Sequence, residues 1–169
     1  LREAAEELPE SGGAVIQLDT SIGPVLIGSR GPDVYARDAA LVLDPGGDDR
    51  WTAGAGSNLG LPGPISLAID LAGDDNYSCD RSHCQGSGFG GVGILIDQGE
   101  GNDAYFAGSQ AQGAALLGFG LLWDDGGNDS YQADSYGQGA GTLGVGLLLD
   151  SGGNDRNIIR ALLHAFSST

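Results

Sequence analysis

The sequence has no lysine and no methionine, and its basic residues are seven arginines. Against these stand 23 acidic residues, so the formal net charge is −16. A nucleic-acid binder needs a basic face that neutralises phosphates, so we expect no nucleic-acid partner. Long apolar runs are also missing. None approaches the ~18 residues of a transmembrane helix, and we expect no membrane span.

Proline is scarce as well, with 6 residues among 169, whereas glycine contributes 32. Collagen needs abundant proline and a glycine at every third position, so it is excluded. Disorder is disfavoured, because 40 % of the residues are hydrophobic and recur in a regular order. The length fits a single domain over residues 1–169.

Cysteine is rare, and the two cysteines, Cys79 and Cys84, flank a short loop. Such a pair can close a small disulfide ring, which implies an oxidising compartment. It can also be a pair of reduced structural thiols, or a metal or redox site with His83, although a fourth zinc ligand is missing. The absence of lysine and the many aspartates fit a secreted or cell-surface protein, and we expect that localisation.

The sequence contains an internal repeat, and this repeat is the main indication of the fold. Five short apolar segments end in an aspartate, at intervals of 26 or 27 residues. We name these the strand-end aspartates: Asp44, Asp70, Asp97, Asp124 and Asp150. Five or six residues later each copy has another aspartate in a Gly-x-Asp motif, and we name these the loop aspartates: Asp49, Asp75, Asp103, Asp129 and Asp155. Asp33 belongs to a first, shortened copy.

Two further features keep the same period. An aromatic residue stands two positions after four of the loop aspartates: Trp51, Tyr77, Tyr105 and Tyr131. An amide stands twelve residues before each of the last four strand-end aspartates, and a glycine-rich stretch follows it: Asn58, Gln85, Gln112 and Gln138. Independent features that agree over at least four copies exclude a chance pattern.

The repeat predicts an all-β fold. Helical repeats are excluded, because each glycine costs ~1 kcal/mol in a helix interior. The short apolar segments, bounded by Gly-Asn-Asp turns, are typical of strands. We therefore expect a parallel β-helix or β-solenoid of about five to six coils over residues 14–157, with equivalent residues stacked ~4.8 Å apart. Leu, Ile, Val, Phe and Ala should line its interior, the amides should form a ladder, and the aromatic residues should stack in a column.

Both ends of the solenoid are expected to carry capping helices. An open end would expose apolar surface and unpaired strand edges. The apolar residues of segments 1–10 and 158–167 recur at helical spacing. They are Leu1, Ala4, Ala5 and Leu8, and then Ile158, Ile159, Leu162, Leu163 and Phe166. These caps are also the expected route of self-association or partner docking.

Stacking places the strand-end aspartates in one column and the loop aspartates, with Asp33, in another. Two carboxylates ~4.8 Å apart repel by ~3–4 kcal/mol at an effective dielectric near 20. Total stability is usually only ~5–15 kcal/mol, and the arginines lie off register. Either backbone N–H groups bind the carboxylates, or protons neutralise them, or cations lie between the coils.

Calcium is the cation that suits this chemistry best. It takes six to eight oxygen ligands in flexible geometry, whereas magnesium demands a stricter octahedron. The loops offer both carboxylates and glycine-flanked carbonyls. The candidate ligands are all of the strand-end and loop aspartates: Asp44, Asp49, Asp70, Asp75, Asp97, Asp103, Asp124, Asp129, Asp150 and Asp155.

The loop motif also resembles a known repeat. Gly-x-Asp-x-Tyr preceded by glycine is similar to the second half of the RTX nonapeptide, and Gly127, Asp129 and Tyr131 match its glycine, aspartate and apolar positions. RTX repeats form calcium-bound parallel β-rolls in secreted bacterial proteins, so the resemblance implies calcium and secretion. Here, however, the motif returns every 26 to 28 residues, whereas the family repeats it every nine residues.

Catalytic motifs are missing. The sequence has no nucleophile elbow, zinc-protease motif or phosphate loop. Its two histidines, His83 and His164, lie in the cysteine loop and in the predicted C-terminal cap. We therefore expect no enzymatic activity.

The sequence favours a calcium-stabilised extracellular structural or adhesive solenoid, with a glycan or a cell-surface protein as partner. One alternative is a carbohydrate-binding or polysaccharide-cleaving β-helix. In it the aromatic column would contact the glycan, and Arg81 would be the counterpart of the arginine base of β-helical lyases. Another alternative is a metal-free spacer or assembly module.

Overall fold

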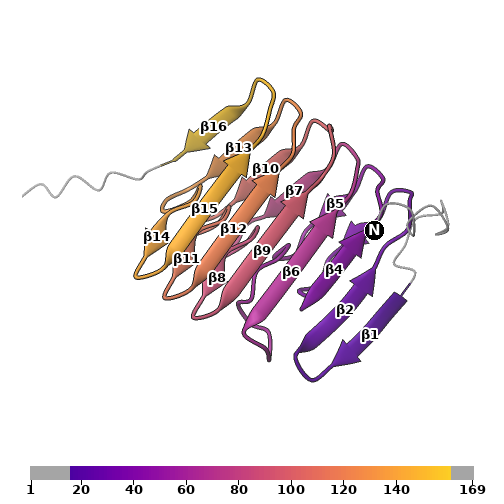
Figure 1. Ribbon diagram of the computed structural model, residues 1–169, viewed down its shortest axis with the longest axis horizontal. Helices are drawn as coiled ribbons and strands as arrows, with labels where there is room; N and C mark the ends of the chain where they lie inside the picture. The colour runs from indigo at the N-terminus through magenta and orange to yellow at the C-terminus, as the bar shows by residue number, and fades with distance from the viewer. Residues whose placement is uncertain (1–15, 161–169) are drawn as a thin grey trace, which may run out of the picture.

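The computed structural model describes residues 16–160, and in this range all regular structure is β (Figure 1). The sixteen strands form three sheets. The long sheet contains β1 (Ile16–Thr20), β2 (Gly23–Ile27), β4 (Leu41–Asp44), β6 (Ile65–Asp70), β9 (Val92–Asp97), β12 (Phe119–Asp124) and β15 (Val145–Asp150). The second sheet contains β3 (Val34–Tyr35), β5 (Arg50–Trp51), β7 (Asn76–Cys79), β10 (Ala104–Ala107), β13 (Ser130–Ala133) and β16 (Arg156–Ile159). The short sheet contains β8 (Gly88–Phe89), β11 (Ala115–Leu116) and β14 (Gly141–Thr142).

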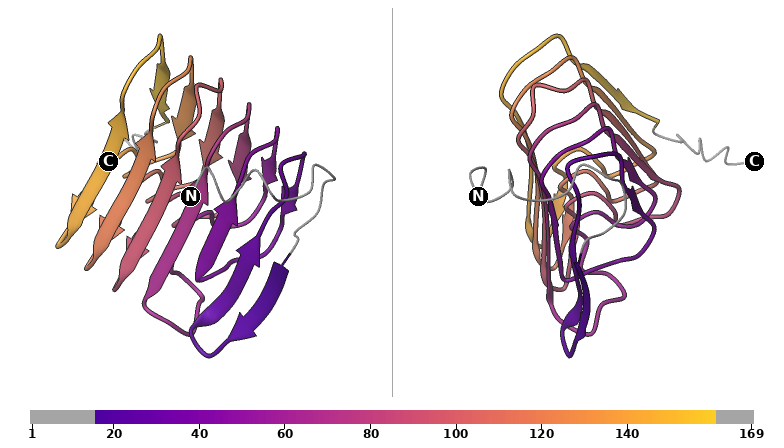
Figure 2. Two further views of the ribbon diagram at one scale, coloured as in Figure 1. Left: turned by 45° about the vertical axis from the view of Figure 1, so that its right-hand side comes forward. Right: turned by 90° about the vertical axis from the view of Figure 1, so that its right-hand side faces the viewer.

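The chain winds as a parallel β-solenoid of about five turns, which confirms the predicted fold. Each coil passes through the long sheet and the second sheet, and the coils that begin at β6, β9 and β12 also contribute a strand to the short sheet. The end-on view in Figure 2 shows the coils superposed. The register pairs each strand-end aspartate with the next one along the column, for example Asp97 with Asp70 and Asp124. The described range contains no helix that is long and apolar enough to cross a membrane.

The ends of the solenoid differ from the prediction. Strand β1 runs antiparallel to β2, so the first described element is a hairpin and not a coil. At the other end, Ile158 and Ile159 belong to β16, which pairs in parallel with β13. The predicted helix over 158–167 is therefore wrong at its start, because ladder hydrogen bonds to β13 outweigh the helical spacing of a few apolar residues. The rest of that segment and the predicted helix over 1–10 lie outside the described residues.

The predicted apolar interior is present, but it takes only alternate residues of each long-sheet strand. In β9, Leu95 is 0 % exposed and Asp97 is 1 % exposed, whereas Ile94 and Ile96 lie on the opposite face and are half-buried. Successive side chains of a strand point to opposite faces. Because each strand-end aspartate points inward, the residue before it must point outward, and only the middle residue of each apolar triplet enters the core.

The aromatic column is confirmed, and it is longer than predicted. Tyr35, Trp51, Tyr77, Tyr105 and Tyr131 stack along the interior with ring centroids 4.1 to 5.3 Å apart. The five side chains are at most 2 % exposed. Stacking of this kind adds to the stabilisation that burial of the ring surface provides.

The predicted ladder from amide to amide does not form. Gln112 instead donates from Nε2 to the carbonyls of Tyr105 and Gln132, at 2.9 and 3.0 Å, and Gln85 and Gln138 make equivalent bonds one coil away. Tyr105 and Gln132 lie on adjacent strands of the second sheet. Each glutamine therefore ties its own coil to the next one through the backbone.

The glycine after this glutamine is required by geometry. Gln85 and Gly86 both have positive φ angles, of 54° and 73°. A Cβ atom on Gly86 would lie 1.9 Å from the carbonyl oxygen of Leu121. The left-handed turn and the close approach of the next coil therefore fix glycine at this position.

Cys79 and Cys84 are joined by a disulfide, as one of the sequence interpretations expected. Both residues are buried, and they pack against Ala107 and Ala111. Cys79 stands in register with Ala107 on the neighbouring strand. The disulfide thus cross-links one turn of a single coil. The next coil has Ala107 and Ala111 at this place.

Candidate metal centre

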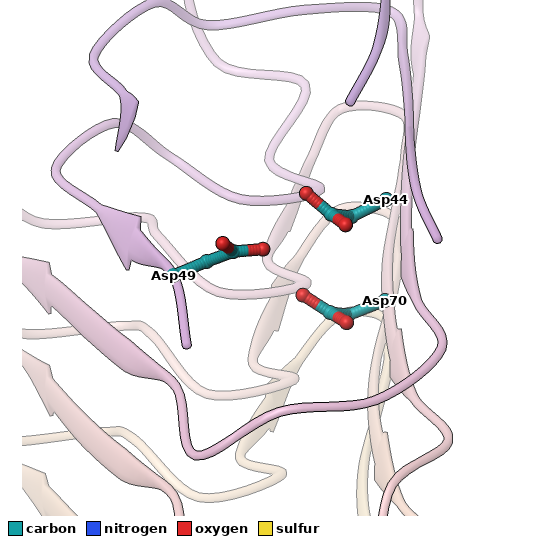
Figure 3. Close-up of side chains that lie close together, drawn as sticks. All are labelled: Asp44, Asp49 and Asp70. Carbon is teal, nitrogen blue, oxygen red and sulfur yellow. The ribbon is translucent and has the colours of Figure 1, made fainter. Parts of the chain in front are cut away.

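The two aspartate columns face each other inside the solenoid. Each strand-end aspartate is the last residue of a long-sheet strand, and each loop aspartate from Asp49 onward stands directly before a strand of the second sheet. Figure 3 shows Asp44 and Asp70 one above the other, with Asp49 opposite them. The short glycine-rich turn between sheets therefore brings together carboxylates that are five or six residues apart in the chain.

The loop aspartates form a ladder with the backbone. The Oδ1 atom of Asp75 accepts a hydrogen bond from the backbone N–H of Asp49, at 2.6 Å, and the Oδ1 atom of Asp103 accepts one from Asp75, also at 2.6 Å. The same link joins Asp33 to Asp49, Asp103 to Asp129, and Asp129 to Asp155. Backbone N–H groups therefore compensate one oxygen of each of these carboxylates.

The strand-end aspartates are held differently. The Oδ1 atom of Asp124 accepts a bond from the N–H of Gly126, at 2.9 Å, and the other four make the same turn. In three of them the Oδ2 atom accepts a bond from a tyrosine hydroxyl. Tyr77 donates to Asp97 at 2.8 Å, Tyr105 donates to Asp124 at 2.7 Å, and Tyr35 donates to Asp44. The fixed spacing of the aromatic residues is the only sequence signal that points to these phenol contacts.

Several buried carboxylate oxygens accept no hydrogen bond within residues 16–160. They are the Oδ2 atoms of Asp49, Asp70, Asp75, Asp103, Asp129 and Asp150. An unsatisfied buried polar atom is costly, and an unsatisfied charged one is more so. The existing hydrogen bonds therefore do not account for the whole site.

Asp70 shows how one such oxygen arises. Tyr77 and Tyr105 each donate to the strand-end aspartate of the following coil. Trp51 holds the corresponding place one coil earlier, stacked on Tyr77, and it has no hydroxyl. The Oδ2 atom of Asp70 thus loses the phenol donor that Asp97 and Asp124 have, although Asp70 is 0 % exposed.

Four triads of carboxylates result, and in each the three ligand atoms lie within 4.8 Å of one another. The triads are Asp44, Asp49 and Asp70; Asp70, Asp75 and Asp97; Asp97, Asp103 and Asp124; and Asp129, Asp150 and Asp155. Together they contain all of the candidate ligands from the sequence. Asp70 and Asp97 each belong to two triads, so the first three triads are continuous.

Burial governs the electrostatics of the triads. Loss of hydration raises the pKa of Asp75 and of Asp103 to about 9, and neighbouring carboxylates add to the effect. The pKa of Asp44 is also raised, by burial and by the adjacent Asp49 carboxyl group. Burial raises the pKa of Asp97 only to about 6, because the hydroxyls of Tyr77 and Tyr105 favour its charged form. Without a cation, several of these groups would therefore hold protons at neutral pH.

The geometry fits a divalent cation with oxygen ligands. A separation of 4.8 Å or less between ligand atoms matches two Ca–O distances of 2.3–2.6 Å across one ion. Each coil contributes one strand-end and one loop carboxylate, so one divalent cation per coil would neutralise the column. The salt bridges of Arg37 and Arg81 use Asp19 and Asp38, which lie outside the triads.

The other sequence candidates do not assemble a second site. His83 lies in the disulfide loop, and burial lowers its pKa. Arg81 pairs with Asp38 and with no triad member. The aromatic column is interior, so its rings are not available to contact a glycan.

No protein-family model, curated protein or solved structure matches this chain. The RTX resemblance therefore has no support from a family match. What stands is the class of architecture: a parallel β-solenoid with a period of about 26 residues and with acidic clusters that could hold a metal ion.

Proposed function

We propose that the protein is a calcium-stabilised structural β-solenoid that works outside the cell, where it serves as a rigid module for adhesion or display. The observation that carries this proposal is the column of carboxylate triads, three of them fully buried, in which buried oxygens accept no hydrogen bond. A bound cation would supply the missing partner for these oxygens and would neutralise the repulsion between coils.

Calcium fits this proposal better than magnesium. The triads differ in make-up, because three of them combine two strand-end aspartates with one loop aspartate, whereas the fourth has one strand-end and two loop aspartates. A flexible coordination shell tolerates such variation, and carboxylates that bind through both oxygens help to reach six or more ligands. Magnesium would require near-ideal octahedral geometry at every site.

The extracellular setting is supported by the disulfide between Cys79 and Cys84. Disulfides persist mainly in oxidising compartments. Calcium sites of extracellular modules have Kd values of ~10⁻⁴–10⁻³ M, so modest affinity at each triad would suffice there. The proposed role is not catalytic, and a glycan or a cell-surface protein remains the proposed class of partner.

Thermal unfolding with and without calcium tests the proposal. We expect the chelated protein to melt at a lower temperature, and we expect millimolar calcium to restore the melting temperature more than millimolar magnesium does. A melting temperature that is the same in chelator and in calcium would show that calcium does not stabilise the protein.

A neighbouring pair of variants localises the effect. Asp75→Asn removes a charge from a triad, whereas Asp74→Asn changes the adjacent exposed residue in the same way. We expect Asp75→Asn to weaken the calcium-dependent shift and Asp74→Asn to leave it intact. Equal calcium shifts in both variants would place the ion elsewhere.

A further inference from the structure

Apart from Thr20 at the end of β1, the outer face of the long sheet presents apolar side chains. We name it the apolar face, and its members alternate with the inward residues of the seven strands. They are Ile16, Leu18, Val25, Ile27, Leu41, Leu43, Ile65, Leu67, Ile69, Val92, Ile94, Ile96, Phe119, Leu121, Trp123, Val145, Leu147 and Leu149. The face contains no charged residue, although the whole chain carries a net charge of −16.

Strand register fixes which residues belong to this face. Ile94 pairs with Leu67 on one side and with Leu121 on the other, and paired residues share a face. The antiparallel strand β1 continues the pattern, because Leu18 pairs with Val25. Figure 1 shows the strands of the long sheet side by side from β1 to β15, so the apolar residues on this face follow one another from strand to strand.

Within residues 16–160 no element packs on the apolar face, and several of its side chains are exposed. Ile65 and Val145 are each 53 % exposed, and Leu18 is 58 % exposed. The residues in mid-sheet are half-buried, because their neighbours on adjacent strands shield them. By contrast, the outer face of the second sheet mixes polar residues such as Asn76 and Ser78 with a single large ring, Phe106.

The size of the face corresponds to a protein interface. Seven strands that lie ~4.8 Å apart and are about five residues long outline a plan area of roughly 500 Å². The largest apolar patch on a monomer covers ~300–600 Å² and is often functional. A standard interface buries ~800 Å² of accessible surface per partner, and the relief of the side chains brings this face close to that value.

We propose that the apolar face is the contact surface for a second copy of this chain, packed face to face about a two-fold axis. A closed two-fold contact uses the same patch on both partners. Sheets pack in this way ~10 Å apart, with their side chains interdigitated. Both partners would present ridges of side chains with the same spacing between strands, so the surface is self-complementary.

The charge distribution favours a second copy over an anionic membrane surface or a terminal segment of the same chain. Two copies that meet through the apolar face bring no carboxylates into contact, since the face has none. The rim offers no cluster of lysine or arginine that would hold an anionic lipid surface. The segment 1–15 is a poor cover for this face, because it includes four glutamates.

Light scattering coupled to size exclusion tests the proposal on the full chain, in calcium and in chelator, at up to about 100 µM, where a standard-size interface is saturated. We expect a dimer for the wild type and a monomer, with the molar mass halved, for Ile94→Lys combined with Leu121→Lys. These residues are cross-strand partners on the neighbouring strands β9 and β12, away from both edges of the face. Lysine lowers the net negative charge, so general repulsion cannot cause the dissociation.

Phe106→Lys is the matched control, because Phe106 is exposed on the second sheet. We expect this variant to stay dimeric. A wild-type monomer, or a dimer that survives the double substitution, would overturn the proposal. A wild-type monomer that floats with zwitterionic vesicles would overturn it in favour of a membrane surface. Association is measured with and without calcium. Failure of the dimer proposal is therefore distinguishable from failure of the metal proposal.

Discussion

The interior of the solenoid and the apolar face of its long sheet show the reverse of the usual distribution of polar and apolar residues. In the long sheet the strand-end aspartates point inward, whereas the apolar residues directly before them point outward. Adjacent residues such as Ile96 and Asp97 therefore have opposite environments. The fold therefore combines a narrow apolar core with backbone ladders, aromatic stacking and carboxylates that must be neutralised.

The largest expected effect comes from pH in the absence of a cation. Folding raises the pKa of Asp75 and Asp103 to about 9, against ~3.9 in the unfolded chain. The folded state then binds more protons between about pH 4 and pH 9, so its stability falls as pH rises through that window. We expect the melting temperature in chelator, followed by circular dichroism, to fall steadily from pH 5 to pH 9.

Calcium should remove most of this dependence, because the cation replaces the protons. Its stabilising effect should therefore grow with pH. A melting temperature that stays flat over the same range in chelator would contradict the assigned state of the carboxylates.

Removal of one aromatic ring should have the next largest effect. Tyr105→Ala interrupts the stack between Tyr77 and Tyr131 and takes a hydroxyl donor from Asp124. We expect a loss of about 4 kcal/mol in the free energy of unfolding, from the cavity and the unsatisfied carboxylate together. Phe106→Ala, one residue along and on the outside, should cost less than half as much. Denaturant titration of both variants gives the comparison, and equal losses would show that the stack contributes little.

The disulfide should contribute a smaller amount. A ring closed by residues 79–84 is short, and the loop-entropy relation gives about 2 kcal/mol for such a ring. We expect Cys79→Ala with Cys84→Ala to lose about this much, because Ala107 and Ala111 show that alanine fits the corner in the next coil. Denaturant titration of the double variant, compared with the reduced wild type, checks the value. A loss far above it would mean that the sulfur atoms also pack an essential part of the core.

The smallest effect is expected on the exposed asparagine ladder. Asn128 donates to the side chain of Asn102, and Asn154 donates to that of Asn128. These contacts are exposed, so Asn128→Ala should cost about 0.5 kcal/mol or less in chemical denaturation. A loss of unfolding free energy as large as that of Tyr105→Ala would show that the exposed asparagine ladder stabilises the fold as much as the interior stack does.

Period and spacing were sufficient to predict the solenoid, the aromatic column and the two facing aspartate columns. Each depends on residues that recur at one register, and parallel stacking converts that recurrence directly into contact. The outward direction of residues such as Ile94 and Ile96 could have been found as well, because strand alternation and an inward Asp97 leave no other choice.

Other features could not be predicted, because they depend on where a side chain ends in space. The sequence does not show that Gln112 reaches the backbone of the second sheet before it reaches another amide. Nor does it show that tyrosine hydroxyls meet the strand-end aspartates. Ile158 and Ile159 continue the strand ladder because the preceding coil offers hydrogen bonds to β16, and periodicity within the segment contains no sign of that partner.

The most direct test of the central claim is to count the calcium ions and locate them in crystals of the protein grown with calcium. We predict one calcium ion in each of the four triads, with oxygen contacts at 2.3–2.6 Å. Triads that contain no ion at saturating calcium, with carboxyl groups paired by protons instead, would contradict it.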